Sequence, residues 1–230
     1  ARALGRTVGP VVPSLVPLVE QGGDCSQMMG LSLRNCGVKV TRQDRKKPVY
    51  EDFGELLFTH FGLSGPTILS ASAHMHPMEA GLYTIHLDLK PALSEIQLDA
   101  RLLRDFEKNK NRIFANSLDE LLPQKLIPIA VRRSGIPGET RCHSITREER
   151  QAFGRLLKDF PIRISGFRPL AEAIVTSGGV SLKEVDPRTM ESKLVKGLYF
   201  AGELLDVDAY TGGYNLQIAF STGHLAGSFL

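Results

Sequence analysis

Two carboxylates and a pair of glycines lie close together near the end of the 230-residue sequence. Glu203 and Asp206 come first, and Gly212 and Gly213 then precede residues 215–228, which we expect to form a helix. Carboxylates accept hydrogen bonds from hydroxyl groups, and a helix start offers backbone N–H groups and the positive end of the helix dipole. This combination is suited to a ribityl-flavin cofactor, which carries hydroxyl groups and accepts electrons.

A short apolar run at residues 198–201 is expected to position these carboxylates. The run contains two aromatic residues and is followed by Gly202, as in a short buried strand that ends in a turn. Two more glycine-bearing turns follow predicted strands, at residues 62–66 and 176–180. A single turn of this kind is weak evidence because most strands end near glycine, but the three turns together with the two carboxylates indicate a ligand site.

Other kinds of active site have less support. The six histidines show no metal-ligand spacing beyond His74 and His76, and the three cysteines form no C-x-x-C pair. Neither a G-x-S-x-G hydrolase elbow nor a P-loop is present in the sequence. We therefore predict no metal site, and we expect reduced thiols in a cytoplasmic protein.

Composition argues against two classes of partner. The net charge of +3 is small and dispersed, which does not favour nucleic acid. The densest basic cluster, residues 42–47, lies between two strand-like segments and is expected to be a solvated hairpin turn. No apolar run in the sequence approaches the roughly 20 residues that span a bilayer, so we expect no membrane partner.

The first part of the sequence has the pattern of an antiparallel meander. Alternating apolar residues predict strands at residues 31–41, 49–59 and 82–89. We expect a bend near residues 35–37 in the first of these strands and an interruption at Gly54 in the second. Residues 11–19 are apolar but contain two prolines, so they should form an edge strand or an extended arm.

Residues 93–158 carry helix signals instead. Capping boxes, in which serine or threonine is followed three residues later by glutamate or glutamine, begin at Ser94, Ser117 and Thr146. Residues 124–134 predict a further helix despite an internal proline. Together these segments predict a small helical subdomain with leucine stripes that form its core.

Strand alternation returns after this block. Residues 160–167 and 171–176 predict strands, so the strands on either side of the helices are expected to form one sheet or barrel. Earlier in the chain, Pro66 follows two possible capping residues and predicts the start of a short helix over residues 67–74. The predicted fold class is α+β, an antiparallel barrel-like domain with a helical subdomain inserted into it.

Five segments of the sequence resemble a known family, the bacterial FAD-dependent oxidoreductases of the BaiN/YhiN-like group within the two-dinucleotide-binding-domain flavoproteins. The matching segments are residues 4–10, 13–18, 54–66, 173–180 and 197–227. The resemblance implies three parts: a Rossmann-like FAD domain, a β-barrel-like domain inserted into it, and a helical subdomain inserted into the barrel. The pattern of predicted strands and helices is compatible with these two insertions.

The resemblance also implies the cofactor-binding residues. Gly202 and Glu203 are expected near the ribityl chain of FAD, with Asp206 in the same turn. The amides of the helix start would face the pyrimidine end of the isoalloxazine, where a reduced flavin gathers negative charge. This helix start comprises Gly212, Gly213, Tyr214 and Asn215. The segment that passes beside the flavin ring comprises Thr176, Gly178, Gly179 and Val180.

The sequence departs from the family in one respect. It contains no G-x-G-x-x-G turn for the ADP half of FAD, and no acidic residue about 20 positions later. We therefore expect the chain to be the C-terminal part of such an enzyme, inactive alone and unable to hold FAD well. The expected domains are a remnant of the FAD domain at 1–10, the barrel at 11–92 and 159–185, the helical insertion at 93–158 and the FAD-domain C-terminal segment at 186–230.

The resemblance implies a function in hydride transfer. NAD(P)H would reduce FAD, and FAD would reduce a small organic acceptor, for which an enone is the expected class. Tyr210, Tyr214 and His60 are candidate acids by their position near the flavin loops, with simple packing as the alternative for both tyrosines. The competing interpretation is a non-enzymatic ligand- or partner-binding module. In either case the strand at residues 198–201 would expose an edge, so a homo-oligomer or the missing N-terminal segment is the expected partner.

Overall fold

The computed structural model describes residues 3 and 5–229, and its contacts divide the chain into two compact units. Unit 1 comprises residues 1–18, 68–77 and 167–230, and unit 2 comprises residues 19–67 and 78–166. Residues 1, 2, 4 and 230 lie outside the described residues, so the ends of the predicted domains at 1–10 and 186–230 are not described. No helix in the described part of the chain is both long and apolar enough to cross a membrane.

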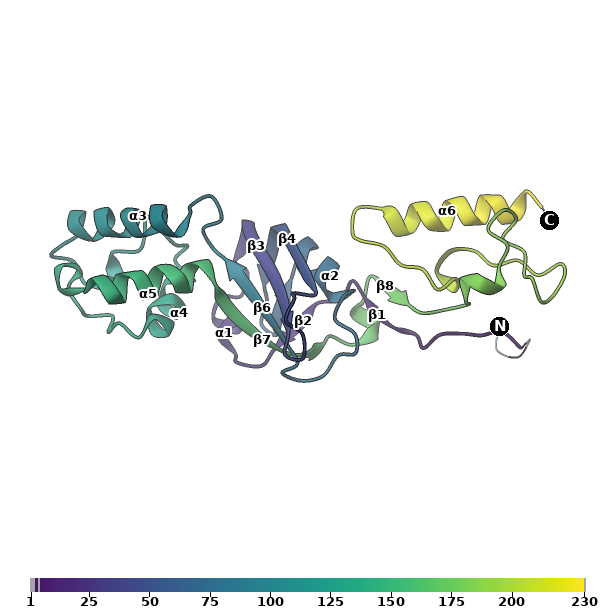
Figure 1. Ribbon diagram of the computed structural model, residues 1–230, viewed down its shortest axis with the longest axis horizontal. Helices are drawn as coiled ribbons and strands as arrows, with labels where there is room; N and C mark the ends of the chain where they lie inside the picture. The colour runs from purple at the N-terminus through teal and green to yellow at the C-terminus, as the bar shows by residue number, and fades with distance from the viewer. Residues whose placement is uncertain (1–2, 4, 230) are drawn as a thin grey trace. The chain divides into compact units, whose positions relative to one another are not determined.

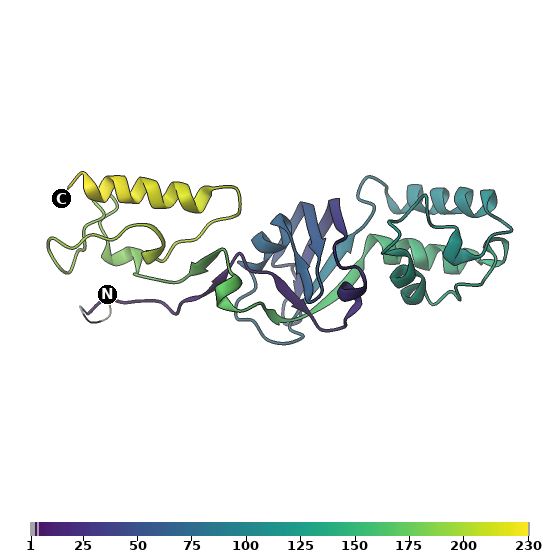
Figure 2. The same cartoon turned by 180° about the vertical axis from the view of Figure 1, so that it is seen from behind.

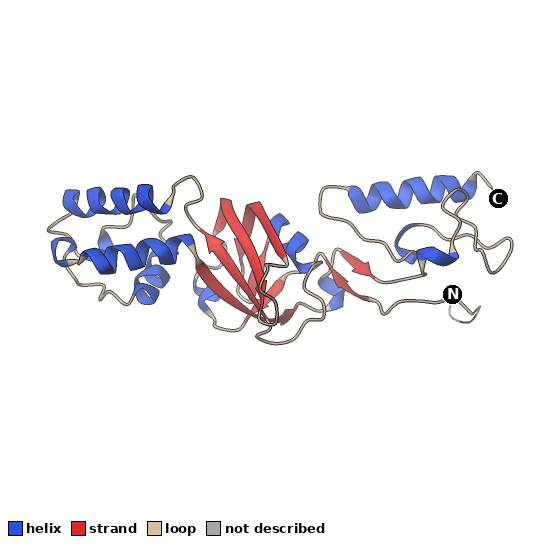
Figure 3. Ribbon diagram, viewed as in Figure 1, coloured by secondary structure: helices blue, strands red, loops and turns tan. Residues whose placement is uncertain are grey.

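Unit 2 is built on a closed barrel whose strands follow the order β2-β5-β4-β3-β6-β7 (Figure 1; Figure 3, red). Neighbours pair in antiparallel fashion in β3–β4, β3–β6, β4–β5 and β6–β7. Every second residue of β6, and of β7 as far as Ile164, is fully buried, which is the alternation of a strand with one face on a core. The strands are β2 (Leu18–Glu20), β3 (Ser32–Arg42), β4 (Tyr50–Phe58), β5 (Gly62–Ser64), β6 (Tyr83–Asp88) and β7 (Phe160–Phe167).

The structure confirms most of the predicted barrel strands and corrects two details. The expected bend in β3 is present as a shift in register between Leu33 and Cys36. The interruption at Gly54 was a wrong prediction, since β4 continues through Gly54, where a Cβ atom would lie 2.6 Å from Thr67 Oγ1. Glycine at this position therefore leaves room for the Thr67 side chain. The segment predicted as a turn at residues 62–66 begins as strand β5.

The helices of unit 2 follow the capping signals in two cases out of three. Both Ser94 and Thr146 form complete capping boxes. Ser117 starts no helix, because its hydroxyl donates to the Phe114 carbonyl and closes the preceding 3-10 turn η2 (Phe114–Asn116). Pro128 lies in the first turn of its helix, where a missing N–H costs nothing. The helices are α1 (Asp24–Gln27), α3 (Glu95–Lys108), α4 (Ile127–Ser134) and α5 (Arg147–Lys158), with the 3-10 turn η3 (Cys142–Ser144).

Helices α3 and α5 lie side by side in both views (Figures 1 and 2). Phe114 packs edge-on between Phe106 and Phe153, with ring centroids 5.9 and 5.2 Å apart. Such edge-to-face contacts favour a fixed arrangement of rings in a core. The leucine stripes predicted from the sequence therefore form the core of this helical group, together with these aromatic side chains.

Unit 1 has little regular structure and a small core. One cluster of buried residues in it comprises Val180, Val185, Met190, Phe200, Leu205 and Ala226. Strand β1 (Val12–Ser14) pairs with β8 (Val175–Ser177) in an antiparallel ribbon. The helices are α2 (Pro66–Ser72), which begins in unit 2, and α6 (Tyr214–Gly227). Within residues 5–229, unit 1 also contains the 3-10 turns η4 (Leu170–Glu172), η5 (Leu182–Glu184) and η6 (Gly202–Leu204).

Local predictions in unit 1 have mixed outcomes. The helix expected at residues 215–228 is confirmed as α6, and Pro66 is the first residue of α2 as expected. The predicted strand at 171–176 is wrong in its first half, which forms η4. The predicted strand at 198–201 is also wrong, since within the described residues Tyr199 forms one isolated bridge, to Glu191. A strand needs a continuous ladder of partners, and the residues opposite this run form an irregular loop.

Candidate functional site

A cavity of about 390 Å³ lies in unit 1 and contains much of the predicted site. Part of its lining is glycine-rich and polar, from η6 and the start of α6. The rest is apolar and was not predicted from the sequence. The lining residues are Leu15, Ile174, Val175, Gly202, Glu203, Val207, Tyr210, Thr211, Gly212, Gly213, Asn215, Leu216, Ile218 and Ala219.

Glu203 lies in η6 and joins this turn to β8. Its Oε1 atom accepts hydrogen bonds from the backbone N and the hydroxyl of Thr176, both at 2.6 Å. The adjacent Gly202 has a left-handed φ of 62°, and its N–H donates to the Thr222 hydroxyl of α6 at 2.9 Å. The hydrogen bonds of Glu203 and Gly202 therefore join η6 to β8 and to α6, respectively.

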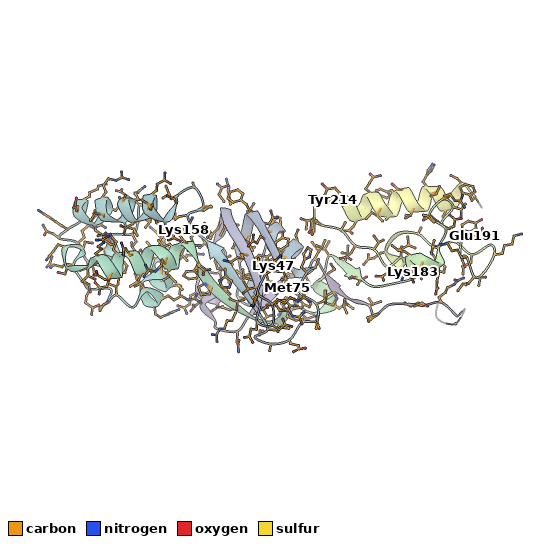
Figure 4. All side chains as sticks on the ribbon, viewed as in Figure 1. Lys47, Met75, Lys158, Lys183, Glu191 and Tyr214 are labelled. Atoms are coloured by element: carbon orange, nitrogen blue, oxygen red, sulfur yellow. The ribbon has the colours of Figure 1, made fainter. Side chains whose placement is uncertain are left out.

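The start of α6 is shaped by two glycines and one asparagine. Gly212 and Gly213 have φ values of 111° and 91°, which favour glycine over any residue with a Cβ atom. Asn215 bonds the backbone of Ala209 with both side-chain atoms and so closes the loop before the helix. Tyr214, the first residue of α6, is 62% exposed and does not line the cavity (Figure 4).

The segment at residues 176–180 is packed against the chain itself. A Cβ atom on Gly178 would lie 2.1 Å from the Pro10 carbonyl oxygen, and one on Gly179 would lie 2.7 Å from the Leu204 oxygen. Val180 is buried, and its carbonyl accepts from the Asp206 N–H at 2.9 Å. These residues and Asp206 therefore lie together, but none of them lines the cavity, so their contact with a cofactor stays a prediction.

The three candidate acids occupy different environments. Tyr210 lines the cavity, and its hydroxyl lies 2.8 Å from Nε2 of His74. His60 belongs to unit 2, where its ring packs edge-on against Phe61 with centroids 4.9 Å apart. Sequence reasoning missed His74, because 136 positions separate it from Tyr210 and no spacing signal links them.

A second histidine lies close to the Tyr210 segment. Burial of His76 lowers its pKa, an effect that the negative charge of Asp208 opposes. The Ser14 hydroxyl donates to the Asp208 carboxylate, and the His76 ring packs against Phe167 with centroids 5.2 Å apart. These contacts tie β1, the segment after α2 and the loop before α6 together within unit 1.

The remaining chemistry-bearing groups form no site. Among residues 3 and 5–229, no cluster of three or more histidine, cysteine or acidic side chains could hold a metal ion. All three cysteines are free and buried. Burial raises the pKa of Cys36 to about 12 and raises that of Cys25 far above its ordinary value, so neither has the character of a reactive thiolate.

Comparisons with known proteins place this geometry in a family. Residues 12–175 match the family model described as the HI0933-like protein barrel and H2TH domain. The chain is 32% identical over 232 residues to a 3-dehydro-bile acid delta(4,6)-reductase of Clostridium scindens, which covers 99% of this chain and 55% of that protein.

Two further relatives are ribosomal RNA dihydrouridine synthases. The Escherichia coli protein is 35% identical over 167 residues, covering 73% of this chain and 40% of that protein. The Haemophilus influenzae protein is 31% identical over 220 residues, covering 94% of this chain and 51% of that protein. The chain thus spans about half the length of the curated relatives it matches. With the barrel and inserted helices in place at residues 12–175, the chain belongs to the HI0933-like family, as the resemblance of its sequence indicated.

Proposed function

We propose that the whole protein is an FAD-dependent oxidoreductase, and that this chain forms the isoalloxazine and ribityl side of the cofactor pocket. The observation that carries the proposal is the cavity of about 390 Å³, which is lined by Glu203 and the glycine-rich start of α6 together with apolar side chains. Cofactor pockets are of this size, mostly apolar, with a few placed polar groups. The printed names of the relatives, a reductase and two dihydrouridine synthases, support a reductive reaction.

The residues present fit the flavin part of FAD. Open space surrounds the position of a Cβ atom at Gly213, so a ring can approach the backbone there. Oε1 of Glu203 accepts both hydrogen bonds from Thr176, so Oε2 is the oxygen suited to accept a hydrogen bond from a ribityl hydroxyl. The N-terminal dipole of α6 favours negative charge at the nearby end of the ring system.

The chain's own residues would perform three tasks around the cofactor. Glu203 would orient the ribityl chain, and the α6 amides would stabilise charge on the reduced ring. Ile174, Leu216 and Ile218 would exclude water from the reacting face. The bound flavin would supply hydride chemistry, which no side chain of this cavity can supply.

We propose an organic acceptor with a carbon–carbon double bond conjugated to a carbonyl, and NAD(P)H as the source of hydride. The relatives named above act on a 3-dehydro bile acid and on uridine in RNA. Both compounds contain such a double bond, so a common reaction class accounts for both printed names.

The test is the FAD content of the whole protein. We expect purified protein to be yellow with one FAD per chain, and Glu203→Ala to reduce FAD retention at least tenfold. Glu203→Gln keeps an acceptor for Thr176 and should retain more FAD than the alanine variant. Glu172→Ala removes a carboxylate of unit 1 that does not line the cavity, so retention should stay unchanged. A colourless protein that does not bind added FAD would contradict the proposal and favour a non-enzymatic binding module.

A further inference from the structure

A tyrosine, Tyr210, lines the cavity. The two ionisable residues of the lining are Glu203 and Tyr210. The phenol of tyrosine carries an O–H group that it can donate, and tyrosine is one of the side chains that act as general acids. Glu203 is also engaged with Thr176, whereas the Tyr210 hydroxyl is directed to an imidazole.

The imidazole of His74 lies beside the hydroxyl of Tyr210, a residue that is itself 47% exposed. Nε2 of His74 lies 2.8 Å from the Tyr210 hydroxyl, a distance at which either atom can donate according to the imidazole tautomer. The ring centroids are 5.7 Å apart, and His74 is exposed. Histidine is the side chain that exchanges protons with water near neutral pH. Tyr210 therefore joins the cavity on one side to a proton-exchanging group on the other.

We propose that Tyr210 is the proton donor of the cavity and that His74 restores its proton. The proposal rests on the proposed function above. A bound reduced flavin would supply the hydride, which is two electrons and one hydrogen, that an enone takes up at its β-carbon. The resulting enolate then takes a proton from the Tyr210 hydroxyl at the α-carbon. The Tyr210 phenolate takes a proton from Nε2 of His74, which regains one from water, so that one double bond has gained two hydrogens.

The neighbouring titratable groups are consistent with this division of roles. His76 and Asp208 lie two residues from His74 and Tyr210, respectively. Asp208 is bonded by Ser14, and burial lowers the pKa of His76, which disfavours its protonated form. The hydrogen bond to Tyr210 is made by the exposed His74 and not by the half-buried His76.

The test uses the whole protein with bound FAD, NAD(P)H and two acceptors. The first acceptor, 2-cyclohexenone, requires a proton on carbon, and the second, ferricyanide, takes electrons only. Tyr210→Phe should lower cyclohexenone reduction at least 100-fold, the usual minimum for a general acid, and leave ferricyanide reduction within twofold of the unmodified protein. Tyr199→Phe removes a hydroxyl elsewhere in unit 1, which is bonded to the Phe229 carbonyl, and should change neither rate.

His74 requires readouts that a purely structural role would not move. His74→Gln keeps a hydrogen-bond donor for Tyr210 but cannot pass on a proton, so it should lower cyclohexenone reduction and leave ferricyanide reduction within twofold of the unmodified protein. Independently of turnover, the ¹⁵N resonance of His74 Nε2 should shift in Tyr210→Phe and not in Tyr199→Phe.

The outcomes separate this inference from the proposed function. Failure of the unmodified protein to bind FAD, or to reduce either acceptor, would contradict the proposed function and this inference with it. An active protein whose Tyr210→Phe variant reduces cyclohexenone within threefold of normal would overturn the inference alone. The inference would also be overturned if Tyr210→Phe lowered the rates of cyclohexenone and ferricyanide reduction equally, because that result indicates a defect in the cofactor site.

Discussion

Asn215 and Ala209 are joined by two hydrogen bonds that run in opposite directions. The Asn215 Oδ1 atom accepts from the Ala209 N–H at 2.8 Å, and its Nδ2 atom donates to the Ala209 carbonyl at 2.7 Å. The side chain thus imitates a strand partner and closes the loop that carries Tyr210 and the two glycines. An amide is the one side chain of this length that can both donate and accept in this way.

We expect Asn215→Ala to open this loop. The two backbone groups of Ala209 would lose their partners, at a cost of about 1–3 kcal/mol in the free energy of unfolding. Gln217→Ala removes an amide of α6 that bonds Ser221 on the helix surface, and should cost much less. Denaturant unfolding measures both changes, and limited proteolysis should cleave residues 209–213 faster in Asn215→Ala alone. Equal stability of the two variants would contradict the role given to Asn215.

Gly178→Ala is expected to destabilise unit 1 by about 2 kcal/mol or more. Its Cβ atom would lie 2.1 Å from the Pro10 oxygen, and its φ of 94° is unfavourable for alanine, so both sterics and backbone conformation oppose the change. Gly223→Ala is the matched control, because Gly223 lies within α6 with nothing within 4 Å of its Cβ position. That change should leave stability unchanged or raise it by up to about 1 kcal/mol. Thermal unfolding measures both changes: the midpoint temperature should fall for Gly178→Ala and should stay the same or rise for Gly223→Ala.

The ion pair between Asp99 and Arg150 should make the stability of the α3–α5 pair depend on pH. Two hydrogen bonds, at 2.8 and 3.2 Å, join the two side chains, and the bond from Arg150 holds the pKa of Asp99 below its ordinary range. A carboxyl whose folded-state pKa is lowered stabilises the protein above its unfolded pKa, and this stabilisation is lost as the pH falls through the folded value.

Asp99→Asn should therefore cost about 1 kcal/mol at pH 7, and its difference from the unmodified protein should vanish as the pH falls below about 4. Asp119→Asn breaks a more exposed pair with Arg112, at 3.3 Å, and should cost less. Urea unfolding at several pH values measures both. A difference for Asp99→Asn that persists unchanged at low pH would show that the ion pair is not its cause.

The buried thiols should be inert in the folded protein. Cys25 and Cys36 are fully buried, and burial raises the pKa of each thiol, so the nucleophilic thiolate is scarce at pH 8. We expect both to react with a thiol reagent at least about 100 times more slowly than free cysteine, and at the normal rate after unfolding. Mass spectrometry of the modified peptides measures each rate, and fast labelling of either cysteine would contradict the burial.

The outer face of α6 should promote association. Phe220 of α6 is 69% exposed and, unlike Leu216, does not line the cavity. Such a face is usually covered by other polypeptide. We expect light scattering of the 230-residue chain to give a mass above 25.3 kDa, and Phe220→Ser to lower it. Ile96→Ser changes an isolated exposed residue of α3 and should have no effect. A monomer in every case would contradict this proposal.

The sequence by itself determined features that depend on neighbouring residues. Ser94 and Thr146 mark helix starts because a capping box is closed within four residues. The alternation at residues 82–89 predicted β6 because a strand with one buried face requires it. The glycines and the carboxylate of the cavity were likewise recognisable from their spacing after an apolar run.

Only the tertiary structure decided the features that depend on distant partners. Ser117 carries the same local signal as Ser94, but its hydroxyl bonds a turn instead of a helix start. The run at residues 198–201 has strand composition but lies against an irregular loop, which offers one bridge and not a ladder. His74 meets Tyr210 across 136 positions, and Gly178 meets Pro10 across the β1–β8 ribbon. Each of these contacts joins segments that lie far apart in the sequence, so no local pattern predicts it. The contacts are therefore seen only in the folded protein.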